Sequence, residues 1–240
     1  MNDCTEKKPP NQQLAALFLR LAARELQTPA SHLKSRFLAL AEESDPWKAR
    51  EEIRELSENM HLLSRLIETL SDAADIETQH VTLENAEINL AHLFSERIGK
   101  RLWSFPSFRF LPELPPRLDI YGDRTRLTFL IDDLLDASIH IAPEGGIIHA
   151  FLMRENDRIF LSTTNRDAEI PPFCFDSFID WMAKDLENPG ALQGIGIGLY
   201  RSHLTALILG GRLDITSPPE GGASFRVEFP VHHTQQSDLP

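Results

Sequence analysis

The sequence has little cysteine, no excess of basic residues and no long apolar run, and each absence excludes a class of protein. Its 240 residues include only Cys4 and Cys174, too few for a disulfide framework or a metal site of paired thiolates. Acidic residues outnumber basic ones by 36 to 24, which disfavours nucleic acid or an anionic membrane as the main partner. No apolar run approaches the roughly 18 residues of a membrane span, and the N-terminus lacks a signal-peptide pattern. We therefore expect a globular cytoplasmic protein.

The first third of the chain has the apolar spacing of two long helices. Asp45 is a suitable N-cap and Pro46 a suitable first helical residue, so a short loop there folds the helices into an antiparallel hairpin over residues 13–78. The apolar positions are Leu19, Ala22, Leu26, Ala30, Leu33, Phe37 and Leu40, then Ala49, Ile53, Leu56, Met60, Leu63, Ile67, Leu70 and Ala74. The second set is a heptad seam. Because one hairpin leaves such a seam uncovered, we expect a second copy to complete a four-helix bundle; the alternative is packing on the rest of the chain.

From residue 81 to residue 232 the apolar period changes between that of strands and that of helices. Strands are predicted at 81–88, 108–111, 117–121, 147–153, 159–164, 213–216 and 224–229, and helices at 90–102, 124–141 and 200–209. Helices interleaved with hairpins are typical of a two-layer α+β sandwich. The polar ends, residues 1–12 and 233–240, are predicted to be flexible tails.

Six short motifs, in this order, resemble the cytoplasmic core of a bacterial sensor histidine kinase. They are ARELQTP at 23–29, SRLIETLSDAADIE at 64–77, GDRTRL at 122–127, the segment 133–146, GIGIGL at 194–199 and GGASF at 221–225. The resemblance covers nearly all of residues 16–231. It implies a dimerising helical hairpin with an H box, followed by a GHKL-type α/β sandwich that binds ATP.

Arg24 stands at the H-box position where the family has its phosphate-accepting histidine. A guanidinium stays protonated and has no lone pair suited to attack phosphorus, so autophosphorylation at this site is excluded. Arg24 is about 200° around the helix from Leu26, so we expect its side chain to project into solvent.

The ATP-binding residues that the resemblance implies are altered. Asp133 and Ala137 stand at the two N-box asparagines, the second of which helps to hold Mg²⁺ in the family. Asn165 replaces the aspartate that reads the adenine amino group, and its side chain still has an acceptor oxygen. Asp167 and Glu169 replace glycines of the first glycine box, and each carboxylate near a bound phosphate costs roughly 3 kcal/mol.

The second glycine box keeps Gly194, Gly196 and Gly198 before a helix. These glycines can present backbone N–H groups to an anion, or they can simply allow close packing of the helix. We expect ATP and Mg²⁺ binding to be weak or lost, with Asp133, Asn165 and the three glycines as the remaining nucleotide contacts, and we expect no separate metal site.

Glu25 and Thr28 keep one chemical possibility open. In the family, an acidic residue and a threonine at this spacing support removal of phosphate from a response regulator, and residues three apart lie on one helical face. A threonine hydroxyl can orient water toward an aspartyl phosphate without ATP or the histidine. Phosphatase activity is therefore an alternative function.

The main hypothesis is a kinase-inactive two-component regulator that forms a homodimer through residues 13–78. Its expected partner is a response-regulator receiver domain or a histidine kinase. The predicted docking face consists of Arg24, Gln27, Ser31, Lys34, Ser35, Ser64 and Arg65. A further alternative is a phosphotransfer protein that uses His32 or His61 in place of the missing histidine.

Overall fold

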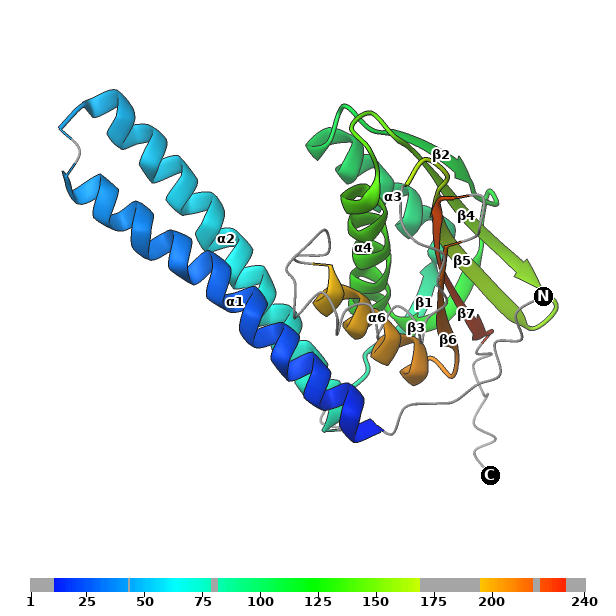
Figure 1. The fold of residues 1–240 in the computed structure, drawn as a ribbon. Helices are drawn as coiled ribbons and strands as arrows, with labels where there is room; N and C mark the ends of the chain where they lie inside the picture. Colours follow the sequence, from blue (N-terminus) through cyan, green and yellow to red (C-terminus); the bar gives the residue numbers. More distant parts are fainter. Residues whose placement is uncertain (1–10, 43, 79–81, 169–194, 218–220, 232–240) are drawn as a thin grey trace.

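Two long antiparallel helices project from a domain built on a sheet (Figure 1). They are α1 (Asn11–Glu42) and α2 (Pro46–Glu77). Asp45 caps α2, because its Oδ1 accepts a hydrogen bond of 2.8 Å from the backbone N–H of Trp47. The predicted hairpin and its capping residue are therefore confirmed. This computed structural model describes residues 11–42, 44–78, 82–168, 195–217 and 221–231.

The domain contains a five-stranded sheet in the order β2-β4-β5-β7-β6, and a separate pair of strands, β1 and β3. Its elements are β1 (Asn85–Asn89), α3 (Leu90–Ser104), β2 (Arg109–Glu113), β3 (Asp119–Asp123), α4 (Arg124–Ile141), β4 (Ile147–Glu155), β5 (Arg158–Asn165), α6 (Gly196–Ile208), β6 (Arg212–Thr216) and β7 (Ala223–Pro230). β2 runs parallel to β4, and the other pairs in this sheet are antiparallel. Every predicted strand and helix of the domain is found, with shifted ends.

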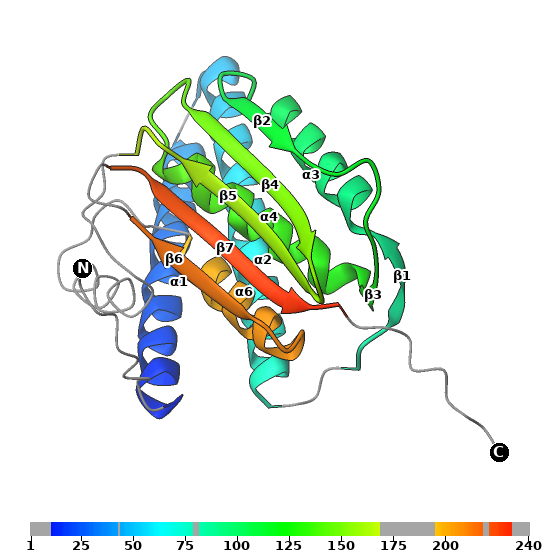
Figure 2. The same cartoon turned by 90° about the vertical axis from the view of Figure 1, so that its right-hand side faces the viewer.

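The helices α3, α4 and α6 cover one face of the sheet, and α4 and α6 lie between the sheet and the hairpin (Figure 2). The face of α4 that meets the sheet is fully buried at Leu127, Ile131 and Leu134. One polar contact crosses this layer: the Ser138 hydroxyl donates to Thr163 Oγ1 over 2.7 Å. A buried hydroxyl pair of this kind fixes the position of α4 on β5.

The heptad seam of α2 divides into two rows. Ala49, Leu56, Leu63 and Leu70 are half-buried, whereas Ile53, Met60 and Ile67 are 54%, 60% and 50% exposed. The row that contains Leu56 therefore meets α1, and the row that contains Met60 is left half exposed or more by the described residues.

The predicted seam on α1 is only partly covered within a single chain. Ala22 is buried and Leu26, Leu33 and Leu40 are half-buried, whereas Leu19 is 67% exposed and Phe37 is 66% exposed. Near residue 24 the buried stripe is centred one residue earlier than the seam, because Phe18, Leu21 and Glu25 are buried beside Ala22. A shift of one residue rotates the centre of the buried face by about 100°.

The hairpin also packs on its own domain near the ends of the two helices. Phe18 of α1 stacks on Tyr200 of α6 with 4.2 Å between the ring centroids. Asp72 of α2 forms an ion pair with Arg126 of α4. We call residues 18–29 and 66–76 the proximal hairpin, and residues 30–63 the distal hairpin. Packing on the rest of the chain, the alternative to dimerisation, therefore occurs in the proximal hairpin.

Candidate functional site

Arg24, at the H-box position, lies on α1 within the proximal hairpin. Its side chain is only 15% exposed, and one guanidinium nitrogen lies 3.3 Å from Oε1 of Glu25. The expectation that Arg24 projects into solvent is therefore wrong. The cause is the one-residue shift of the buried stripe, which brings Glu25 into the interior and holds Arg24 beside it.

Glu25 and Thr28 do not form an open pair on the surface. The Glu25 side chain is 4% exposed and is paired with Arg24, and Thr28 is half-buried. A receiver domain that approaches the hairpin from outside does not meet the Glu25 carboxylate in this arrangement. The geometry therefore weakens the phosphatase alternative, which stays a prediction.

The rest of the predicted docking face is accessible. Gln27, Ser31, Lys34 and Ser35 on α1 and Ser64 on α2 are exposed. Arg65 belongs to α2, but its side chain lies outside the described residues. His32 and His61, the alternative phosphate acceptors, are exposed as well.

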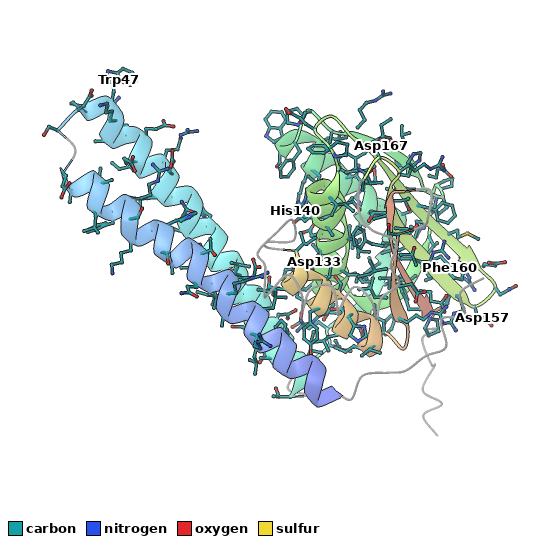
Figure 3. The ribbon with its side chains drawn as sticks, in the orientation of Figure 1. Trp47, Asp133, His140, Asp157, Phe160 and Asp167 are labelled. Carbon is teal, nitrogen blue, oxygen red and sulfur yellow. The ribbon has the colours of Figure 1, made fainter. Side chains whose placement is uncertain are left out.

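Asp133 is buried between α4 and α6 (Figure 3). Its carboxylate accepts two hydrogen bonds from Arg201 of α6, at 2.9 and 2.7 Å, and a weaker one of 3.3 Å from the Ser202 hydroxyl. The Arg201 guanidinium also lies over the ring of Phe129, 4.3 Å from its centroid. Burial raises the pKa of Asp133 to about 6, although the Arg201 charge opposes this rise. Asp133 is therefore already fully engaged by its own chain.

Gly198 gives room for this contact. A Cβ atom at residue 198 would lie 2.9 Å from Oδ1 of Asp133, so a larger residue there would push the carboxylate away. Gly198 is the third residue of α6, where the N-terminal N–H groups carry partial positive charge and attract an anion. The Asp133 carboxylate thus lies where the glycine box was expected to receive a phosphate. Gly196 begins α6 and is buried, and Gly194 lies outside the described residues.

The remaining nucleotide positions do not fit Mg²⁺ and adenine. Ala137 is fully buried and has no side-chain oxygen to offer a cation. Asn165 is fully buried, and its Oδ1 accepts a 2.7 Å hydrogen bond from the backbone N–H of Asp167, while its Nδ2 has no hydrogen-bond partner among the described residues. The oxygen that was expected to accept from the adenine amino group therefore already accepts one hydrogen bond from the backbone. Asp167 is exposed, and Glu169 lies outside the described residues.

A cavity of about 290 Å³ lies between α2 and the helices α3, α4 and α6. Its charged lining residues are Glu68, Arg97, Arg101, Asp132, Asp133, Asp136 and Arg201. Each of the three arginines is paired with an aspartate of α4. The charge of each of these arginines is thus largely neutralised by an aspartate, which weakens its attraction for a phosphate group.

Sequence reasoning missed this network of arginines and aspartates. Arg97 binds Asp132 through two hydrogen bonds, and Arg101 binds Asp136 in the same way. A signal was present in the sequence: each pair of like residues is spaced by four, so two arginines on one helix match two aspartates on another. Arg201 gave no comparable signal, because its partner is 68 residues away.

Comparisons with known proteins agree with the fold described above. Residues 122–233 match the family described as histidine kinase-, DNA gyrase B-, and HSP90-like ATPase. The chain is 28% identical to the alginate biosynthesis sensor protein KinB of Pseudomonas aeruginosa, over 96% of this chain and 39% of KinB. It is 22% identical to the signal transduction histidine-protein kinase BaeS of Escherichia coli K12, over 95% of this chain and 50% of BaeS. The chain thus spans half or less of the length of these two relatives.

Solved structures show the same fold. The histidine kinase AdeS of Acinetobacter baumannii superposes with a TM-score of 0.66 at 18% identity, over 87% of this chain and 98% of that structure. The histidine kinase ThkA, in complex with the response regulator protein TrrA, gives a TM-score of 0.61 at 20% identity, over 88% of this chain and 60% of that structure.

A helical hairpin joined to a two-layer sandwich is also the fold of the histidine kinase AdeS. The chain therefore has the fold of a histidine kinase core, and its residues 122–233 match the GHKL-type ATPase family. Among the residues that the structure describes, no helix is long and apolar enough to cross a membrane.

Proposed function

We propose that this chain is a two-component signalling regulator that does not phosphorylate itself and that acts by binding a response-regulator receiver domain. The observation that carries the proposal is Arg24, a residue without a nucleophilic nitrogen at the H-box position of a histidine kinase core. In this position Arg24 cannot accept phosphate, whatever nucleotide the domain binds.

The ATPase domain supports the same conclusion. Asp133 is bound by Arg201, Ala137 provides no side-chain ligand for a cation, and Oδ1 of Asn165 already accepts a backbone hydrogen bond. Each change removes or weakens a contact that Mg²⁺ or ATP would need. We therefore propose that nucleotide binding is weak or lost.

Dimerisation is proposed through the distal hairpin. Ile53 and Met60 on α2 and Phe37 on α1 are more than half exposed in the single chain. Apolar side chains at heptad spacing on two helices are covered most simply by the same helices of a second copy. The complex of ThkA with TrrA supports a response regulator as the kind of partner. A partner kinase, bound through the same seam, is the alternative, and the cytoplasmic location stays a prediction.

The test is incubation of the purified chain with radioactive ATP, with and without Mg²⁺. We expect no acid-labile phosphate on the wild type and none on Arg24→His, because both the acceptor and the nucleotide site are altered. Labelling of Arg24→His alone would show that the nucleotide site works and that only the acceptor is missing. Labelling of the wild type would overturn the proposal, and titration with unlabelled ATP separates loss of binding from loss of chemistry.

Each of the two enzymatic alternatives can be tested with substitutions in this chain. Loss of dephosphorylation of a phosphorylated receiver on Thr28→Ala, with Ser57→Ala unchanged, would establish the phosphatase. Transfer of phosphate from the receiver to the chain, lost on His32→Gln or His61→Gln, would establish the phosphotransfer protein.

A further inference from the structure

The ion pair of Asp133 and Arg201 is more buried than the neighbouring pair of Arg101 and Asp136. The side chains of Arg201 and Asp133 are 8% and 9% exposed, whereas that of Asp136 is 25% exposed. Arg101 also lies 3.4 Å from a second carboxylate, that of Asp132. Among the ion pairs of the described residues, Arg201 has Asp133 alone. The buried charge of Arg201 is therefore compensated by a single carboxylate.

The groups around this carboxylate are those of an anion-binding site. Arg201 donates to both carboxylate oxygens, at 2.9 and 2.7 Å, and the Ser202 hydroxyl adds a weaker contact of 3.3 Å. Helix α6 begins without a side-chain cap, and its third residue, Gly198, leaves room for the carboxylate. A guanidinium fork, a hydroxyl and a helix N-terminus all bind carboxylate and phosphate oxygens in proteins. The anion in this site is a side chain of the same chain.

Arg201 is held in place by a second contact that does not involve Asp133. Its guanidinium lies over the ring of Phe129, 4.3 Å from the ring centroid. Arg201, Asp133 and Gly198 all line the cavity of about 290 Å³ described above. A small anion that entered this cavity would therefore meet Arg201 if the Asp133 carboxylate were absent.

We propose that Asp133 is an internal ligand: its carboxylate occupies an oxyanion site formed by Arg201, Ser202 and the start of α6, and closes this site to diffusible carboxylates and phosphates. The site takes up an external anion when the Asp133 side chain is shortened, because the buried Arg201 charge is then uncompensated. The internal ligand agrees with the proposed loss of nucleotide binding but does not depend on it, because it rests on contacts within the chain.

The test is chemical rescue by formate at about pH 7.5, where formate is charged. Asp133→Ala removes the carboxylate and leaves space for an anion of similar size. We expect the Tm of this variant to fall by about 5 °C or more, because a buried guanidinium loses its partner. Sodium formate at about 100 mM should recover at least half of that loss, and sodium chloride at the same concentration should not. Formate should leave the Tm of the wild type unchanged relative to chloride.

The chain provides matched controls for this variant. Asp133→Asn fills the same space with an uncharged amide, so formate should not rescue it. Asp136→Ala removes a carboxylate from the same group of ion pairs, but Asp132 remains beside Arg101, so formate should have no specific effect. The double variant Asp133→Leu/Arg201→Leu replaces the ion pair by apolar side chains and should fold without a response to formate. If Asp133→Ala does not fold alone, formate-dependent refolding by circular dichroism is measured instead.

Binding of a phosphate oxyanion is measured by calorimetric titration with inorganic phosphate. We expect Asp133→Ala to bind phosphate at least about tenfold more tightly than the wild type, and Asp133→Ala/Arg201→Leu to lose this gain. Failure of formate to rescue Asp133→Ala, or equal rescue of Asp133→Asn, would overturn the internal ligand. Titration of the wild type with ATP tests the proposed function separately, because formate carries neither base nor phosphate.

Discussion

The proximal and distal parts of the hairpin differ in how much of their apolar surface is covered within the chain. In the proximal part, Leu21 and Ala73 are 2% and 0% exposed, and helix α6 of the same chain packs on both hairpin helices. In the distal part, Met60 is 60% exposed and Phe37 is 66% exposed, and Trp47 at the tip stands far from the domain (Figure 3). The domain thus covers apolar side chains beside the seam at one end, and at the other end the exposed row of the seam has no such neighbour among the described residues.

The difference shows that a heptad pattern specifies an apolar surface and not the partner that covers it. The buried proximal residues contribute to the stability of the single chain, while the exposed distal row that contains Met60 is expected to contribute only in the proposed dimer. Substitutions in the two parts are therefore expected to affect different measured quantities.

The largest effect is expected from charges in the distal seam. The double variant Ile53→Glu/Met60→Glu places four carboxylates into the core of the proposed four-helix bundle, where unpaired charges are strongly unfavourable. We expect a particle of twice 27.2 kDa to become one of 27.2 kDa in light scattering. Arg54→Glu changes the net charge by the same amount at an exposed position about 100° around α2 from Ile53 and should keep the dimer. An unchanged mass for the first variant would contradict dimerisation through this seam.

A cavity in the proximal hairpin should have the next largest effect. Leu21→Ala removes a fully packed side chain and should lower the free energy of unfolding by about 2–5 kcal/mol. Met60→Ala removes an exposed side chain and should change it by less than about 0.5 kcal/mol at protein concentrations where the chain is monomeric. Urea denaturation of both variants tests the comparison. If both variants lost the same amount of unfolding free energy, the two side chains would be equally buried, which contradicts the comparison.

The smallest effect is expected from the pairing of Asp133 on α4 with Arg201 on α6. The pKa of Asp133 in the folded chain, about 6, is above its unfolded value near 3.9. This group therefore stabilises the fold fully below pH 4, and that contribution is lost as the pH rises through 6. Relative to Asp133→Asn, the wild type should lose at most about 3 kcal/mol of unfolding free energy between pH 4 and 7. Urea denaturation measures the unfolding free energy of both proteins. A difference between wild type and Asp133→Asn that stays constant from pH 4 to 7 would contradict the raised pKa.

Local signals in the sequence predicted much of the fold. Asp45 followed by Pro46 fixed the turn of the hairpin, and α4 was predicted with the bounds it has, Arg124–Ile141. The face of α1 was predicted less well, because Phe18 and Leu19 are both apolar and periodicity alone cannot choose between them. The choice is made by Tyr200, which is distant in sequence and stacks on Phe18.

The candidate site was predicted by position but not by environment. The place of Arg24 on the first helix was correct, while its burial depends on the packing of the whole domain. The pairing of Asp133 with Arg201 joins two helices that no local pattern connects. Arrangements of this kind depend on tertiary contacts, which a single sequence does not report.

The approach of Asp133 to Gly198 has a consequence for how this domain responds to the cell. A domain that is completed by a diffusing ligand gains stability with the concentration of that ligand. Here the negative group near the start of α6 is covalently part of the polypeptide, so its local concentration never varies. With nucleotide binding weak or lost, as proposed, the stability of this domain should not depend on the energy state of the cell, and its regulation would come from the proteins that bind it.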